Sequence, residues 1–104
     1  MATPPVFDPA TFADSVRAVV RRIPAGQVMS YSEVAQAVGA PRHARAVARV
    51  MASNYLPDVP CHRVIRSNGS LGGYNRGGEV KKRALLRSEG YPSERLGRFD
   101  SVIH

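Results

Sequence analysis

Apolar residues recur at helical spacing in the first quarter of the chain. Between Thr11 and Ile23 they fall at positions i, i+4, i+7, i+8 and i+11: Phe12, Val16, Val19, Val20 and Ile23. This spacing places them on one stripe of a helix, which is typical of a helix that packs against a core. The sequence Pro-Ala-Gly at 24–26 follows at once and predicts that the helix ends there.

The next two helices are predicted mainly by their end signals. Ser-Tyr-Ser-Glu at 30–33 is typical of a capping box, so a short helix should follow and stop at Gly39. Pro41 suits the first turn of another helix, because the N–H that proline lacks is unpaired there. That helix should run to about Ala52. Two short helices joined by a tight glycine-containing turn match a helix-turn-helix.

The second helix of this pair has two distinct faces. Small and apolar residues form one of them: Ala44, Val47, Ala48 and Met51. Arginines form the other, with Ala46 beside them: Arg42, Arg45 and Arg49. A face of arginines and small side chains can enter the groove of a nucleic acid.

The second half of the chain predicts a short strand, a turn and a last helix. Val64 and Ile65 form the expected strand, Ser-Asn-Gly at 67–69 is a turn signal, and residues 71–74 would pair back as a wing. The last helix should span about 79–88 and end at Gly90. Its inward-facing residues are expected to be Val80, Ala84 and Leu85.

These elements predict a mainly α-helical fold with a small β wing, a winged helix-turn-helix. The 104 residues suffice for a single domain with its core at about 10–90, and we expect no N-terminal domain. No apolar run approaches the ~20 residues of a membrane span, and the start lacks the pattern of a signal peptide. We therefore expect a cytoplasmic protein, or a nuclear one in a eukaryote, that does not bind membranes.

The charge distribution narrows the choice of partners. Lys and Arg number 15 against 8 Asp and Glu, which gives a net charge of +7. Residues 42–87 contain ten of the basic residues but only two acids, Asp58 and Glu79. A basic half beside a nearly neutral one is typical of proteins that bind a polyanion, although a solubilising surface remains an alternative.

Cys61 is the only cysteine and the candidate nucleophile. A thiol reacts as its thiolate, which neighbouring cationic or hydrogen-bonding groups favour, and His62 and Arg63 follow it directly. A carboxylate that orients the histidine would complete a relay, and Glu89 is a candidate. Spacing alone leaves open that Cys61 is an inert core residue. The cysteine and the three histidines show no zinc-ligand spacing, so we expect no metal.

Several ordered motifs resemble the C-terminal domain of the O6-alkylguanine-DNA alkyltransferases. They lie between about Phe12 and Gly90: Ile-Pro-Ala-Gly-Gln-Val-Met-Ser-Tyr-Ser-Glu-Val-Ala at 23–35, Ala-Arg-Ala-Val at 44–47, Pro-Cys-His-Arg-Val at 60–64 and Gly-Gly-Tyr at 72–74. The resemblance implies that a monomer binds double-stranded DNA containing O6-alkylguanine. Cys61 would accept the alkyl group irreversibly, once per molecule and without a cofactor.

The resemblance also implies roles for the residues around Cys61. His62 would take the thiol proton through a water, Glu89 would orient His62, and Asn54 would hold the active-site turn. Tyr31 would rotate the nucleotide at its 3′ phosphate and donate a proton to the leaving guanine.

Further roles concern DNA and the extruded base. Arg45 would fill the gap that the base leaves in the stack. The other expected DNA contacts are Ala46, Arg42 and Arg49, and the expected base-pocket residues are Tyr74, Gly73, Asn75 and Val64.

Two features depart from the family pattern. The chain has the length of the alkyltransferase-like proteins, which bind alkylated DNA and pass the lesion to nucleotide excision repair proteins without catalysis. Their cysteine is typically replaced, whereas this chain keeps Cys61. The loop at Asn75–Gly78 is one residue longer than usual, with Arg76 where a small residue often stands. We favour an active alkyltransferase over a non-catalytic lesion-binding protein or a plain winged-helix module.

Overall fold

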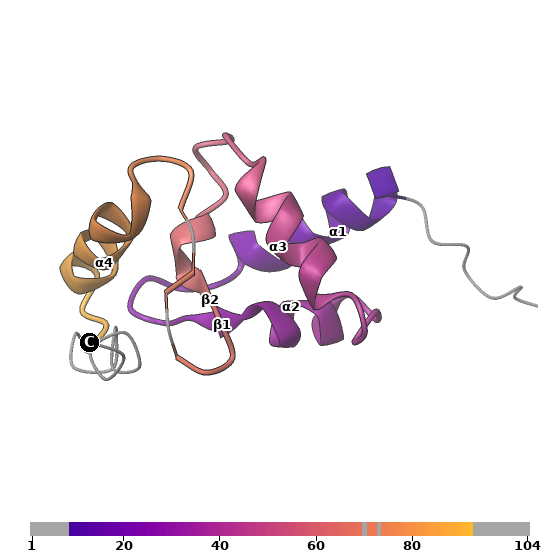
Figure 1. Ribbon diagram of the computed structural model, residues 1–104, viewed down its shortest axis with the longest axis horizontal. Coiled ribbons are helices and arrows are strands. Elements are labelled where there is room, and N and C mark those ends of the chain that lie inside the picture. Colours follow the sequence, from indigo (N-terminus) through magenta and orange to yellow (C-terminus); the bar gives the residue numbers. More distant parts are fainter. Residues whose placement is uncertain (1–8, 70, 73, 93–104) are drawn as a thin grey trace, which may run out of the picture.

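The computed structural model describes residues 9–69, 71–72 and 74–92. The elements follow in the order α1 (Pro9–Arg21), β1 (Met29–Ser30), α2 (Tyr31–Ala37), α3 (Ala44–Ala52), η1 (Cys61–Arg63), β2 (Val64–Ile65) and α4 (Gly78–Ser88). In Figure 1, α1, α2 and α3 gather at one end and α4 lies at the other, with the two strands between them. The predicted mainly helical fold with a small sheet is confirmed. Within the described residues, no helix combines the length and the apolar character that crossing a membrane requires.

The main core lies between the first three helices. Four members of the predicted α1 stripe are buried, namely Phe12, Val16, Val20 and Ile23, and Val19 is half-buried. They share a cluster with buried residues of the next two helices: Val34, Ala35, Val47 and Met51. This cluster also contains Val59, Cys61 and Val64, so the segment that carries the cysteine is packed onto the helical core.

The capping box at the start of α2 is present as predicted. The Ser30 hydroxyl accepts a hydrogen bond from the Glu33 amide at 3.0 Å, and the Glu33 carboxylate accepts one from the Ser30 amide at 2.8 Å. Such a cap contributes about 1 kcal/mol to helix stability. It fixes the entry of α2 and therefore the position of Tyr31, the first residue of that helix.

The third helix begins later than predicted. α3 starts at Ala44, with His43 as its cap. The His43 amide donates to the Ala40 carbonyl at 2.9 Å, which closes a turn with Pro41 and Arg42 at its centre. Proline is favoured at the second position of such a turn as well as in the first turn of a helix. Pro41 takes the turn position, so the prediction that it begins the helix was wrong.

The strand at 64–65 pairs with a different partner from the predicted one. β1 and β2 run parallel, with Met29 opposite Val64 and Ser30 opposite Ile65. The described residues of 71–74 form no strand, so the hairpin-like wing was wrong. Instead, the Leu71 carbonyl accepts a hydrogen bond from the side chain of Lys82, and the Leu71 side chain is buried.

The buried face of α4 differs from the face that its apolar residues predicted. Lys82 and Leu86 are its buried residues, whereas Val80 is 83% exposed and Ala84 is also exposed. Leu86 packs with Ile65 and Leu71 in a second, smaller cluster. The inward face was wrongly predicted because one of its two buried positions is a lysine, which an apolar pattern does not register.

Candidate active site

The loop between α3 and η1 positions Cys61. Buried Asn54 holds this loop from within, because its side-chain oxygen accepts from the Leu56 amide at 3.4 Å and its amide group donates to the Val59 carbonyl at 3.5 Å. The Cys61 amide donates to the Val59 carbonyl at 2.8 Å, and the Arg63 amide donates to the Pro60 carbonyl at 2.9 Å. Cys61 therefore opens a tight 3-10 turn, which places His62 and Arg63 directly after it.

Cys61 is 4% exposed and lies within electrostatic reach of two tyrosines. Burial raises the pKa of Tyr31 above its ordinary value, Arg66 opposes that rise, and an ionised Cys61 adds to it. Burial also raises the pKa of Tyr74, and an ionised Cys61 raises it further. Both phenols therefore keep their protons at neutral pH and can donate hydrogen bonds.

His62 and Arg63 both bind the same carboxylate. The Nε2 atom of His62 lies 2.8 Å from Oε2 of Glu89. Arg63 donates to the two oxygens of Glu89 at 2.9 Å and 2.7 Å, and its Nη1 donates to the Ile23 carbonyl at 2.7 Å. The structure thus brings Glu89 to His62, as the sequence predicted. It adds Arg63, which the sequence analysis did not assign although it stands next to the histidine.

The protonation states of this group follow from burial and charge. Burial lowers the pKa of His62 below its ordinary value, while the hydrogen bond and charge of Glu89 raise it in part. Burial would raise the pKa of Glu89, but hydrogen bonds from Arg63 and His62 lower it below its ordinary value. At neutral pH Glu89 is therefore a carboxylate and His62 a neutral imidazole. Because a carboxylate only accepts hydrogen bonds, Nε2 carries the imidazole proton and Nδ1 keeps a lone pair that can accept another.

Close backbone packing brings the end of α4 to this group. Gly26 has φ +87°, and a Cβ placed on it would lie 2.9 Å from the Glu89 carbonyl oxygen. A residue with a side chain would therefore be strained here and would push α4 away. The Pro-Ala-Gly turn after α1 is thus part of the reason that Glu89 reaches His62.

One cavity has Tyr31 and Tyr74 on its wall, and we call it the base cavity; Cys61 is not among the residues that line it. Its volume is about 420 Å³, and its lining residues are Tyr31, Ala48, Ala52, Arg66, Gly72, Tyr74 and Asn75. Gly72 has φ +74°, and a Cβ on it would lie 3.0 Å from the Tyr31 hydroxyl. The absence of a side chain at Gly72 therefore leaves the Tyr31 hydroxyl in place on the cavity wall. Concave sites for small ligands have volumes in this range.

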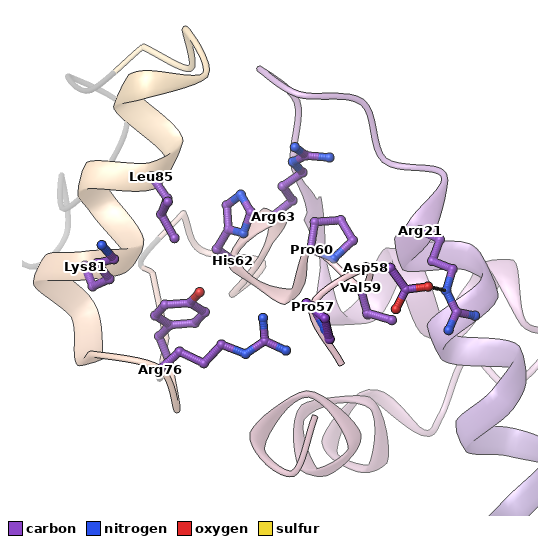
Figure 2. A pocket seen from close by; sticks show the side chains of 11 residues that line it. Arg21, Pro57, Asp58, Val59, Pro60, His62, Arg63, Arg76, Lys81 and Leu85 are labelled. Carbon is purple, nitrogen blue, oxygen red and sulfur yellow. Dashed lines mark hydrogen bonds and ion pairs between the residues drawn. The ribbon is translucent and has the colours of Figure 1, made fainter. Parts of the chain in front are cut away.

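A second cavity of about 510 Å³ lies around His62, and we call it the imidazole cavity. Figure 2 shows its lining, with the ion pair between Arg21 and Asp58 at one side and Lys81 and Leu85 of α4 at the other. Tyr74 lines both cavities and meets the His62 ring in an edge-to-face contact, with 6.4 Å between the ring centroids. Tyr74 therefore links the base cavity to the imidazole.

The loop at Asn75–Gly78 is bonded to the segment that follows α3 and leads to the cysteine. The Asn75 amide group donates to the carbonyls of Ala52 and Asn54 at 2.7 Å and 2.8 Å. Arg76 donates to the Leu56 carbonyl at 2.6 Å. Two side chains of this loop therefore tie it to the 52–56 segment. Asn75 does line the base cavity, as predicted, but its amide nitrogen is used to anchor the loop.

Of the predicted base-pocket residues, one is not on the wall of the base cavity and another cannot be placed. Val64 is fully buried in the main core and lines neither the base cavity nor the imidazole cavity, so its predicted place was wrong. As part of β2, it points into the helical cluster. Gly73 lies outside the described residues.

The arginine face of α3 is smaller than predicted. Arg45 and Arg49 are exposed one turn apart on this helix, whereas Arg42 is exposed in the turn before it. Ala46 is half-buried against the main core. Since Ala48 and Ala52 line the base cavity, α3 carries the arginines and part of the cavity wall on one short segment.

Comparison with known proteins gives consistent matches. The chain matches the family described as 6-O-methylguanine DNA methyltransferase, DNA binding domain, over residues 11–91. The methylated-DNA–protein-cysteine methyltransferase of Rattus norvegicus is 42% identical over 91 residues, which are 86% of this chain and 44% of the relative. The bifunctional transcriptional activator/DNA repair enzyme Ada of Escherichia coli is 45% identical over 85 residues, 81% of this chain and 24% of the relative. The chain thus spans less than half the length of these curated relatives.

Two solved structures with DNA have similar folds. Mycobacterium tuberculosis OGT in complex with DNA has a TM-score of 0.72 at 43% identity, covering 80% of this chain and 52% of that one. S. pombe Atl1 in complex with damaged DNA containing O6-carboxymethylguanine has a TM-score of 0.71 at 35% identity, covering 78% of this chain and 77% of that one.

Proposed function

Because the chain belongs to the 6-O-methylguanine DNA methyltransferase family, whose curated members are DNA repair alkyltransferases, we propose that it repairs O6-alkylguanine in duplex DNA by transferring the alkyl group to Cys61. The observation that carries the proposal is the 2.8 Å contact between His62 and Glu89 directly after the cysteine. It supplies a neutral imidazole with a free lone pair beside the only thiol in the chain. Each molecule acts only once because the thioether formed is stable. It acts as a monomer.

Binding to the duplex relies on the basic half of the chain. Arg45 and Arg49 are exposed on α3, next to the wall of the base cavity. A base within the stack hides the edge that must be attacked, so it has to be extruded at a cost of a few kcal/mol. Arg45 inserts into the gap and offsets that cost, while other basic residues contact phosphates independently of sequence. Tyr31, at the start of α2, guides the nucleotide at its 3′ phosphate.

The base cavity receives the extruded guanine. Its walls combine the aromatic rings of Tyr31 and Tyr74 with the small side chains of Ala48 and Ala52, which suits a flat heterocycle. Tyr31 and Tyr74 both pack against the core cluster that contains Cys61, so a base held between them lies on the side of the core that carries the sulfur. The cavity thereby selects a planar purine and presents its O6 substituent to the thiolate.

The transfer step is a displacement at the alkyl carbon. His62 accepts the thiol proton at Nδ1 through a water, and Glu89 stabilises the imidazolium that forms. The thiolate attacks the alkyl carbon, the sulfur–carbon bond forms, and the carbon–O6 bond breaks. The electrons of that bond remain on the guanine, which takes a proton from the Tyr31 phenol. The products are an S-alkylcysteine and an intact guanine.

A non-catalytic role is the second candidate, and one observation favours it. The chain has the fold of S. pombe Atl1, which was solved with damaged DNA containing O6-carboxymethylguanine, at a TM-score of 0.71 and 35% identity. A protein of that kind would bind alkylated DNA tightly and present it to nucleotide excision repair proteins. The Cys61, His62 and Glu89 group favours the catalytic role, because binding alone does not require an oriented base beside a thiol.

Intact-protein mass and DNA binding, measured on the same samples, separate the two candidates. The protein is mixed with a duplex containing one O6-methylguanine, and a duplex with guanine at that position serves as the control. We expect a mass gain of one methylene with the damaged duplex alone, and no gain for Cys61→Ser, which should still prefer the damaged duplex. Tight binding by the unmodified protein with no mass gain would instead support the non-catalytic role.

A further inference from the structure

Lys82 is buried although the proposed mechanism has no use for it. It lies on α4 with 0% of its surface exposed. Lysine is almost never fully buried, because removing an ammonium from water is costly unless another charge or a set of acceptors replaces the water. The position of Lys82 therefore requires an explanation within the candidate site.

The surroundings of Lys82 point toward Cys61. Its ammonium donates a hydrogen bond to the Leu71 carbonyl at 2.5 Å and lies 5.8 Å from the centre of the Tyr31 ring. Tyr31 is on the wall of the base cavity and itself senses the charge of an ionised Cys61. Tyr31 packs against the core cluster that contains Cys61, and α4 packs against η1, so Lys82, Tyr31 and Cys61 form one cluster.

We propose that the Lys82 ammonium is the counter-ion of the Cys61 thiolate, so that it favours the ionised form of the sulfur before the alkyl group arrives. The inference deepens the proposed function and rests on it. Lys82 acts through Cys61 rather than on the substrate, so it is a positioning residue rather than a catalytic one. The negative charge that pairs with the Lys82 ammonium, the Cys61 thiolate, belongs to the same chain.

Electrostatic coupling supports this assignment. Burial lowers the pKa of Lys82 to about 8, and an ionised Cys61 is the largest influence that acts against that fall. Arg66 lowers the pKa of Lys82 further, and Glu79 raises it.

The other charged and titratable groups around the cysteine do not supply a buried positive charge that could stabilise the thiolate. Arg63 is held by the Glu89 carboxylate in an ion pair with 2.7 Å between nitrogen and oxygen. Burial lowers the pKa of His62, so its imidazole is neutral at pH 7 and carries no charge to offer. Arg66 is exposed, so water screens it, and the protonated phenols of Tyr31 and Tyr74 are uncharged. Lys82 is the buried cation of the described cluster.

The pH dependence of thiol alkylation by iodoacetamide tests the proposal without DNA. The Lys82→Met variant keeps most of the side-chain length and removes the charge. We expect the midpoint pH of Cys61 alkylation to rise by about one unit, a tenfold loss of thiolate at a given pH below the midpoint. Lys82→Arg should largely restore the wild-type midpoint. Arg87→Met removes one exposed charge from the same helix and should leave the midpoint unchanged. Equal midpoints for Lys82→Met and the wild type would overturn the proposal.

The reciprocal measurement does not depend on whether Lys82→Met folds. Electrostatic coupling between two sites must be equal in both directions. The pKa of Lys82 is followed through its ¹³Cε resonance in the wild type and in Cys61→Ser. We expect that pKa to fall in the variant, because the charge that opposes the effect of burial has been removed. An unchanged Lys82 pKa in Cys61→Ser would overturn the proposal.

The outcomes for Lys82 and for the proposed function can be told apart. Iodoacetamide and the lysine titration report on the ion pair, whereas methyl transfer from DNA reports on repair. A shifted midpoint together with no transfer would retain the ion pair and reject repair. Transfer by the wild type together with an unshifted midpoint would retain repair and reject the ion pair.

Discussion

Two effects prepare the imidazole of His62 to accept a proton. Burial keeps the ring neutral, and the hydrogen bond to Glu89 fixes its orientation. A neutral ring can accept a proton, and an ionised Glu89 stabilises the cation that results. Both effects come from residues that the sequence could indicate. His62 follows Cys61, and Glu89 stands as an acid at the C-terminal end of a helix, where its charge opposes the helix dipole and calls for a partner.

Replacing Glu89 with Gln separates its two effects on His62. The charge of Glu89 raises the pKa of His62, so its removal should lower that pKa further. In the wild type, transfer should slow as the pH falls through the pKa of His62, because the protonated ring cannot accept the thiol proton. In Glu89→Gln, we expect this acid limb to move to lower pH and the plateau rate to fall about tenfold or more. Single-turnover rates between pH 5 and 8 measure both, and a limb displaced to higher pH would contradict the assignment.

Gly72 offers a test of the Tyr31 position. In Gly72→Ala the added methyl group would meet the Tyr31 hydroxyl at 3.0 Å, in a backbone conformation that side chains rarely adopt. We expect slower methyl transfer and a loss of about 1 kcal/mol of folding stability. Gly39→Ala is the matched control, since Gly39 has φ +79° but no atom within 4 Å of the added methyl group. Its stability should fall similarly while transfer stays near the wild-type rate, and equal transfer rates for the two variants would exclude this role of Tyr31.

One arginine and one lysine that the sequence analysis did not assign to the site show the limit of sequence reasoning at the scale of residues. Arg63 lies within the Pro-Cys-His-Arg-Val motif, yet only the fold reveals that it joins Glu89 to Ile23, just after α1. Lys82 carried no signal, because a charged residue at a buried helical position resembles any solvated lysine in a sequence. Both depend on contacts between residues far apart in the chain.

At the scale of elements, α3 carries both the exposed arginines that we propose contact DNA and part of the wall of the base cavity. Its arginines are exposed, and its alanines line the base cavity or pack against the core. The apolar pattern predicted this helix and its end correctly, and its start was displaced because proline suits both a turn and a first helical turn. Strands of two residues carry too little pattern to reveal a partner, which is why the pairing of β1 with β2 was missed.

The role of Arg45 is tested by comparison with an arginine on another helix. Arg45→Ala should weaken binding to a duplex with O6-methylguanine by about tenfold, within the range for loss of a specific arginine contact. Arg17→Ala removes the same charge from α1, where Arg17 pairs with Asp14 at 3.3 Å, and should weaken binding much less. Fluorescence anisotropy titrations of both variants at one salt concentration provide the measurement. Equal losses would count against insertion of Arg45 into the stack.

At the scale of the whole molecule, two clusters of buried residues meet at the site. The helical core holds Cys61 from one side, and the smaller cluster carries α4, with Lys82 and Glu89, to the other. The sequence predicted the helical half of this arrangement because three amphipathic helices with clear end signals determine it. The attachment of α4 depends on the Arg63 ion pair, on Gly26 and on the Lys82 hydrogen bond, which no periodicity encodes.

The most direct test of the central claim is to locate the transferred group. The protein is incubated with a duplex whose O6-methylguanine carries a deuterated methyl group, then digested and analysed by tandem mass spectrometry. Our account predicts one labelled methyl group per molecule on the sulfur of Cys61 and unmodified guanine in the recovered DNA. Unmodified Cys61 with the lesion intact, or label on any other residue, would contradict it.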